Sequence, residues 1–230
     1  MGSQQKKIIT LASIAIVILT LIALVPLIYS LVVGAGVKTE GVNAQGAKEA
    51  TTDVNGEWSV VQGSARNYTS VGFTFDEVLP AERTTTSGST TNVTGAAKIS
   101  GEVVEQANVA VDMEMLTTDK TVRDRSMKDK LFKTAEFPQA TFELTEPVDF
   151  TGVPADGTLS TVELSGDLTI KGKTQPVTGT FDVLRDGKYL VIGGSLPINR
   201  LDFDVVTPEF IAAKIAEEGE LNIRLSFVKE

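Results

Sequence analysis

The sequence predicts an all-β domain of about eight antiparallel strands, either a sandwich or a closed up-and-down barrel, behind an apolar N-terminal segment. After Gly56, apolar and polar residues alternate with period two, which is the pattern of strands with one buried face. Hairpin signals such as Asp186-Gly187 separate the alternating runs. From Thr117 to Phe142 the alternation stops, charges crowd together and apolar residues fall near helical spacing. We therefore expect a short helix between two strands.

The composition excludes several classes of function. The 230 residues include no cysteine and no histidine, which excludes disulfides, thiolate chemistry, the usual zinc sites and the His- or Cys-based triads. The formal net charge of −9 argues against a nucleic-acid partner, because such a surface needs clustered Lys and Arg. We expect neither a metal nor a cofactor.

The first 33 residues are predicted to start in the cytoplasm and to anchor the chain in a membrane. No charged residue occurs from Ile8 to Val33, and as a helix this run would be roughly 39 Å long, more than a hydrocarbon core of roughly 30 Å. Lys6 and Lys7 precede the run, so the positive-inside rule places the rest of the chain outside the cell membrane. A cleaved signal peptide is the alternative, but its apolar region would be shorter.

Two further parts follow the anchor. Residues 34–55 are rich in Gly, Ala and Thr and show no period, which predicts a flexible linker. Residues 56–230 then form the β domain. Its first strands are expected near 57–61 and 71–75. The Thr/Ser/Gly run from Thr84 to Asn92 indicates a solvated hairpin loop.

The remaining strands follow from the same alternation. They are expected at 93–104, 109–115, 141–145, 162–170, 177–183, 190–198 and 221–227. The run from Pro208 to Glu218 is a second helix candidate, because proline lies near its start and Gly219 follows its end.

Several motifs resemble the YceI-like family, whose members are lipocalin-like barrels that bind polyisoprenoid lipids. The main match runs from Asp119 to Phe142, with Arg123-Asp124, Leu131-Phe132 and then EFPQATF. Further matching pieces, in order, are Ser70–Phe73, Val93–Gly95, Gly166–Gly172 and Ile198–Phe203, and together they span about Glu57 to Val228. The resemblance implies an antiparallel eight-stranded lipocalin-like barrel with a short helical crossover at one end.

The chain also departs from that family. Its members often show His in the first strands and again after the Arg-Asp pair, where this chain has Asn67, Tyr68 and Ser126. A head-group contact made by those histidines is therefore not carried over.

The resemblance implies a cavity that holds an isoprenoid lipid, either a polyprenyl or a quinone-type ligand. Burial of such a chain contributes about 0.8 kcal/mol per methylene. The residues predicted to line the cavity are Phe73, Phe75, Val111, Met113, Met115, Phe142, Leu144, Leu168, Ile170, Phe181 and Phe227. The alternative for each of them is an ordinary packed core, which is the commoner use of any single such residue. Arg123, Asp124 and Arg200 are candidates for contact with a head group, and a solvated helix face or a structural ion pair is the alternative use of these charges.

We therefore expect a single-pass, membrane-anchored, extracytoplasmic protein that sequesters or carries an isoprenoid lipid and is not an enzyme. The alternative is a non-catalytic extracytoplasmic interaction or stress-related module with a packed barrel. A hydrolase that uses Asp202 and Asp204 is a third hypothesis. Acidic residues at mostly outward strand positions disfavour the hydrolase.

Overall fold

The computed structural model describes residues 38–78, 83–207 and 214–230. The predicted membrane anchor, residues 1–33, lies outside these ranges. Within them, no helix has both the length and the apolar character needed to cross a membrane.

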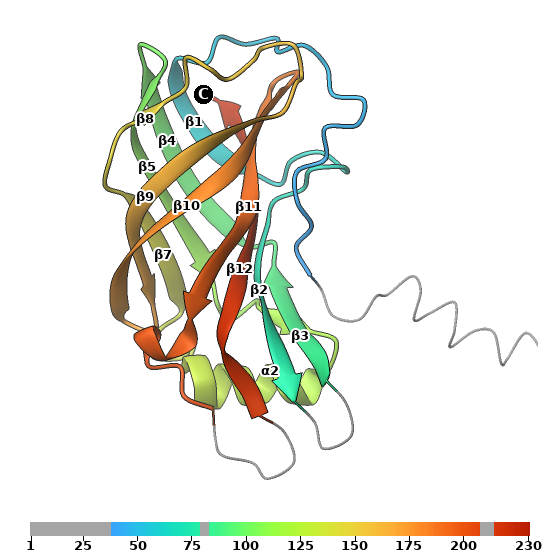
Figure 1. The fold of residues 1–230 in the computed structure, drawn as a ribbon, viewed down its shortest axis with the longest axis vertical. Helices are drawn as coiled ribbons and strands as arrows, with labels where there is room; N and C mark the ends of the chain where they lie inside the picture. The colour runs from blue at the N-terminus through green and yellow to red at the C-terminus, as the bar shows by residue number, and fades with distance from the viewer. Residues whose placement is uncertain (1–37, 79–82, 208–213) are drawn as a thin grey trace, which may run out of the picture. The chain divides into compact units, whose positions relative to one another are not determined.

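The described strands form one antiparallel sheet that closes into a barrel (Figure 1). The barrel has eight strand positions around its circumference. Three of these positions are each filled by two consecutive strands: β1 (Gly56–Val61) and β2 (Ser70–Val78), β3 (Arg83–Thr90) and β4 (Val93–Ser100), and β5 (Val103–Asp112) and β6 (Thr117–Thr118). The other five positions are each filled by one strand: β7 (Gln139–Leu144), β9 (Ser160–Ile170), β10 (Lys173–Asp186), β11 (Tyr189–Asn199) and β12 (Lys214–Lys229). The predicted all-β, eight-stranded antiparallel fold is thereby confirmed.

The last strand closes the barrel, because it has partners along both edges. One edge of β12 pairs with β11, and the other pairs with β2 in its first part and with β1 in its last part. Closure leaves no long unpaired edge, so a barrel is favoured over the sandwich that the alternation also allowed.

A short helical segment lies across one end of the barrel (Figure 1). It consists of α2 (Thr121–Ser126) and the π-helical turn η1 (Met127–Phe132), and it ends at Lys133, whose φ is +50°. The helix predicted between Thr117 and Phe142 is thus confirmed. Asp124 fixes its start, because one carboxylate oxygen accepts hydrogen bonds from the backbone N–H and the hydroxyl of Thr118, both at 2.7 Å. We call residues 120–133 the lid.

The opposite end of the barrel is filled by packed side chains. Trp58 is 2% exposed there, and its indole N–H donates to the carbonyl of Val54 at 2.8 Å. Phe150 and Phe227 belong to the same buried cluster, and β8 (Val148–Asp149) pairs with the start of β5 nearby. This end of the barrel is therefore closed by its core.

Two of the predicted elements differ in the structure. The Thr/Ser/Gly run expected to be a loop is the strand β3, whose residues 83–90 all pair with β2. Its polar composition hid a strand that is stabilised by ladder hydrogen bonds and β-branched threonines rather than by an apolar face. The second helix candidate is also wrong for residues 214–218, which begin β12; its residues 208–213 lie outside the described ranges.

The predicted flexible linker also differs where the structure describes it. Residues 38–55 run along the outside of the barrel and are hydrogen-bonded to it (Figure 1). The N–H of Asn43 donates to the side-chain oxygen of Asn67 at 2.8 Å, and the N–H of Thr51 donates to the carbonyl of Gly187, also at 2.8 Å. Such contacts with distant residues leave no periodic signal in the sequence, which explains why composition alone indicated a free linker.

Candidate functional site

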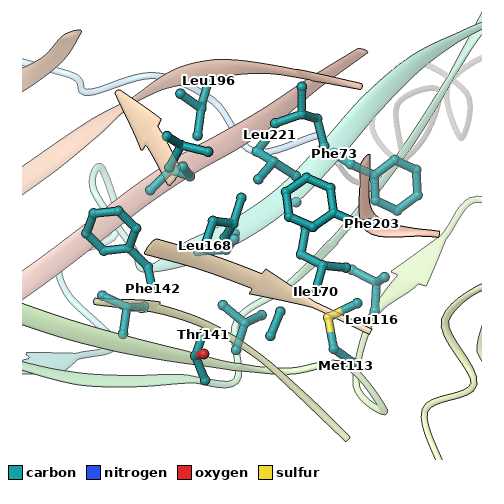
Figure 2. Close-up of a pocket in the computed structure, with 18 of the residues that line it drawn as sticks. Phe73, Met113, Leu116, Thr141, Phe142, Leu168, Ile170, Leu196, Phe203 and Leu221 are labelled. Carbon is teal, nitrogen blue, oxygen red and sulfur yellow. The ribbon is translucent and has the colours of Figure 1, made fainter. Parts of the chain in front are cut away.

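The barrel encloses a cavity of about 600 Å³, which is within the size range of small-molecule sites in proteins. Figure 2 shows part of its wall, where side chains from several strands point toward one another. Cross-strand neighbours build this wall. Phe142 on β7 pairs with Leu168 on β9, and Phe73 on β2 pairs with Leu221 on β12. The surface is almost wholly apolar, so the cavity suits a hydrophobic ligand.

The structure places ten of the eleven predicted lining residues on the cavity wall. They are Phe73, Phe75, Val111, Met113, Phe142, Leu144, Leu168, Ile170, Phe181 and Phe227. Met115 is the exception, because it is 51% exposed and does not reach the cavity. The strand β5 ends at Asp112, so the alternation that predicted an inward Met115 no longer applies, and Leu116 is buried in its place.

Polar side chains of the wall gather at the lid end, with Thr141 lying deeper. The lid contributes Lys120, Arg123, Ser126 and Lys130, and the strand ends nearby contribute Glu77, Thr86, Arg200 and Thr207. The cavity is therefore amphipathic along its length, with an apolar floor near Phe150 and a polar, partly charged mouth beneath the lid.

Arg123 joins this polar mouth to the barrel wall. Its guanidinium forms ion pairs with Asp119, one helical turn earlier, and with Glu77 of β2 at 3.7 Å. A carboxylate oxygen of Glu77 also accepts a hydrogen bond of 2.6 Å from the hydroxyl of Thr86 on β3. These contacts hold one side of the lid over the cavity and set a carboxylate, a hydroxyl and a guanidinium side by side.

The other two head-group candidates make mainly structural contacts. Asp124 does not line the cavity and is bonded to Thr118. Arg200 does line it, but its guanidinium donates to the backbone carbonyls of Val205, Ala216 and Ile215 at 2.7, 3.0 and 3.3 Å. Arg200 thus ties the short helix η2 (Arg200–Phe203) to the start of β12. The ion pair considered for Arg200 and Asp202 is absent from the described contacts.

Sequence reasoning missed Glu77, Thr86, Lys120 and Lys130 as residues of the mouth. Glu77 had a usable signal, because it continues the inward positions of Phe73 and Phe75 by one more step of two. Lys120 and Lys130 had no such signal in the sequence, because the side of a short helix that faces the cavity depends on how the helix docks onto the barrel.

The metal and hydrolase hypotheses both concern where the acidic side chains lie among the described residues. No group of three or more acidic side chains is assembled there in a way that could hold a metal ion. Asp202 and Asp204, the carboxylates of the hydrolase hypothesis, are exposed and do not line the cavity, and Asp204 forms an ion pair with Lys173 at 3.1 Å.

Comparisons with known proteins agree with this architecture. The pattern of the YceI-like domain matches residues 58–227. The UPF0312 protein Ent638_1570 of Enterobacter sp. strain 638 is 30% identical over 142 residues, which cover 59% of this chain and only 58% of that relative.

Two solved structures share the fold. One is BcnA of Burkholderia cenocepacia, with a TM-score of 0.56 and 23% identity, covering 68% of this chain and 95% of BcnA. The other is a polyisoprenoid binding domain from Saccharophagus degradans implicated in plant cell wall breakdown. It has a TM-score of 0.55 and 20% identity, and the match covers 70% of this chain and 98% of that domain.

Proposed function

We propose that this chain, which belongs to the YceI-like domain family, binds an isoprenoid lipid inside its barrel and carries or sequesters it without chemical change. The amphipathic cavity carries the proposal: its deep wall is apolar, and its charged groups are confined to the lid end. A long prenyl chain fits the apolar part, and a polar end group fits the mouth. The polyisoprenoid-binding relative with the same fold supports this ligand class.

The driving force is the removal of the prenyl chain from water, about 0.8 kcal/mol per methylene. At the mouth, Lys120 and Lys130 would meet a phosphate or quinone oxygen, while Arg123 is held by its acidic partners. A barrel packed solid, as the interaction-module alternative requires, is disfavoured by the cavity of about 600 Å³.

We further propose that residues 1–33 anchor the protein in the cell membrane with the barrel domain on the extracytoplasmic side. The uncharged run from Ile8 to Val33 and the preceding lysines support this arrangement. Protease added to intact cells should digest the barrel domain. Protection of the domain in intact cells, with digestion only after lysis, would reverse the proposed orientation.

Native mass spectrometry of the full-length protein, followed by solvent extraction, tests the ligand. Met113→Trp adds bulk on the cavity wall and should lower the amount of retained lipid, whereas Met115→Trp is the matched control, since Met115 is exposed and outside the cavity.

Ligands added to protein stripped of lipid then test the chemical class of the bound ligand. A polyprenyl phosphate and a prenylated quinone of equal chain length should reload stripped wild-type protein, and oleic acid should compete poorly. The proposal would be refuted if no prenyl lipid is recovered from wild-type protein and if Met113→Trp and Met115→Trp take up equal amounts of added prenyl lipid.

A further inference from the structure

The exposed apolar side chains of this protein are concentrated at one end. Of the six large hydrophobic residues exposed in the described ranges, four lie at the lid end: Met115 at 51%, Val122 at 85%, Leu201 at 38% and Val206 at 62%. Met115 precedes the lid, Val122 is in α2, Leu201 is in η2, and Val206 follows η2. Exposed apolar side chains at the mouth of an apolar cavity offer contacts to another apolar phase, such as the interior of a lipid bilayer.

Basic side chains are numerous in the lid. The lid has six Lys or Arg and two Asp, in a chain whose net charge is −9. Lys120, Arg125, Lys130 and Lys133 are exposed, and none of them takes part in an ion pair among the described residues. One of the two lid acids, Asp124, is bonded to Thr118, which leaves Asp129 as the exposed acid of the segment.

The two features coincide with the opening of the cavity. Val122, Lys120 and Lys130 belong both to the exposed lid and to the cavity lining. The rest of the chain has fifteen basic against twenty-eight acidic residues. The positive charge that favours an anionic surface is therefore concentrated in the lid, whose neighbours at the same end include the exposed acids Glu114, Asp119, Asp202 and Asp204.

We infer that the lid end docks onto the surface of an anionic lipid bilayer. In this arrangement Val122 and Met115 enter the region between head groups and acyl chains, and the exposed lid cations lie near lipid phosphates. Each such cation strengthens attachment about fivefold. A ligand could then pass between the bilayer and the cavity without crossing water. The docking itself rests on the lid surface alone and does not depend on the proposed ligand.

Tryptophan fluorescence in lipid nanodiscs tests the docking with the full-length chain. The chain has one native tryptophan, Trp58, which is 2% exposed at the end opposite the lid and so serves as a constant background. The indole introduced by Val122→Trp should be quenched by brominated acyl chains in nanodiscs that contain one part phosphatidylglycerol to two parts phosphatidylcholine. Pure phosphatidylcholine or high salt should abolish most of the quenching.

Leu159→Trp provides the matched control, because Leu159 is 38% exposed just before β9, at the end opposite the lid. Its indole should show no quenching in either nanodisc. Combining Val122→Trp with Arg125→Gln and Lys133→Gln should weaken the docked state by about 25-fold, from two lost cations. Should Val122→Trp fail to fold, Met115→Trp replaces it as the reporter.

Equal quenching at positions 122 and 159, or quenching that is insensitive to phosphatidylglycerol, would overturn the docking inference. Retention of prenyl lipid is measured separately, so the two proposals can fail independently. Quenching at position 122 without retained prenyl lipid would support the docking and refute the proposed ligand. Retained prenyl lipid without quenching would support the ligand and refute the docking.

Discussion

Glycine residues opposite aromatic rings keep the cavity open. Gly166 on β9 lies against the ring of Phe142, and Gly219 on β12 lies against the ring of Phe75. A Cβ atom added at either glycine would collide with the ring beside it. Because glycine has no side chain, each ring can lie directly against the backbone. The ring therefore covers the wall of the barrel instead of projecting across its interior.

Gly166→Ala is therefore expected to destabilise the protein by about 1–3 kcal/mol, since the new methyl group must displace Phe142 and meets the carbonyl of Glu143. Chemical denaturation of the two proteins measures the difference. Gly152→Ala is the control, because nothing lies within 4 Å of a Cβ at that position. Equal stability of Gly166→Ala and Gly152→Ala would contradict the packing of Phe142 against Gly166.

The lid is held on the barrel by a few polar contacts and a few buried apolar side chains. On the inner side of the lid, Met127 is 4% exposed and belongs to a core cluster of the barrel, against which Leu131 and Phe132 also pack. Asp124 joins the lid to β6 through Thr118, and Arg123 joins it to β2 through Glu77. An element with so few attachments is expected to open more easily than the barrel strands.

Asp124→Ala removes two hydrogen bonds to a carboxylate and should cost about 1.5–3 kcal/mol locally. Native-state hydrogen exchange should therefore become faster in residues 121–132, while the amides of β10 and β11 change little. Asp129→Ala is the control in the same lid, because its exposed carboxylate accepts no hydrogen bond from the described residues. Uniform acceleration over barrel and lid would instead show that Asp124 supports the whole fold.

The cavity couples the stability of the whole molecule to ligand binding. The barrel holds about 600 Å³ of apolar space that loses dispersion contacts when unfilled. A ligand that binds only the folded chain stabilises it by about 2.7 kcal/mol at a free concentration one hundred times its Kd.

Delipidated protein should accordingly melt several degrees below protein reloaded with a prenylated lipid, by about 2–4 °C per kcal/mol for a chain of this length. Differential scanning calorimetry over a range of ligand concentrations checks this dependence. Reloaded Met113→Trp should gain less than reloaded wild type. A melting temperature that does not respond to any prenylated lipid would contradict binding inside the barrel.

Residue patterns predict most of the strands, the helical interruption and most of the cavity wall. Period-two alternation reports which side of a strand is buried, so Phe73, Phe142 and Phe181 were placed correctly. The same rule failed at Met115, where the strand had already ended, and at β3, whose threonines and serines lack an apolar face.

Contacts between distant residues fix which charges share the mouth of the cavity and how residues 38–55 lie on the barrel. Glu77 and Arg123 are 46 positions apart in the chain, and their ion pair depends on how the lid docks onto the end of β2. Local pattern encodes burial because burial repeats along a strand or helix. Contacts between distant polar groups do not repeat, so they appear only once the barrel has closed.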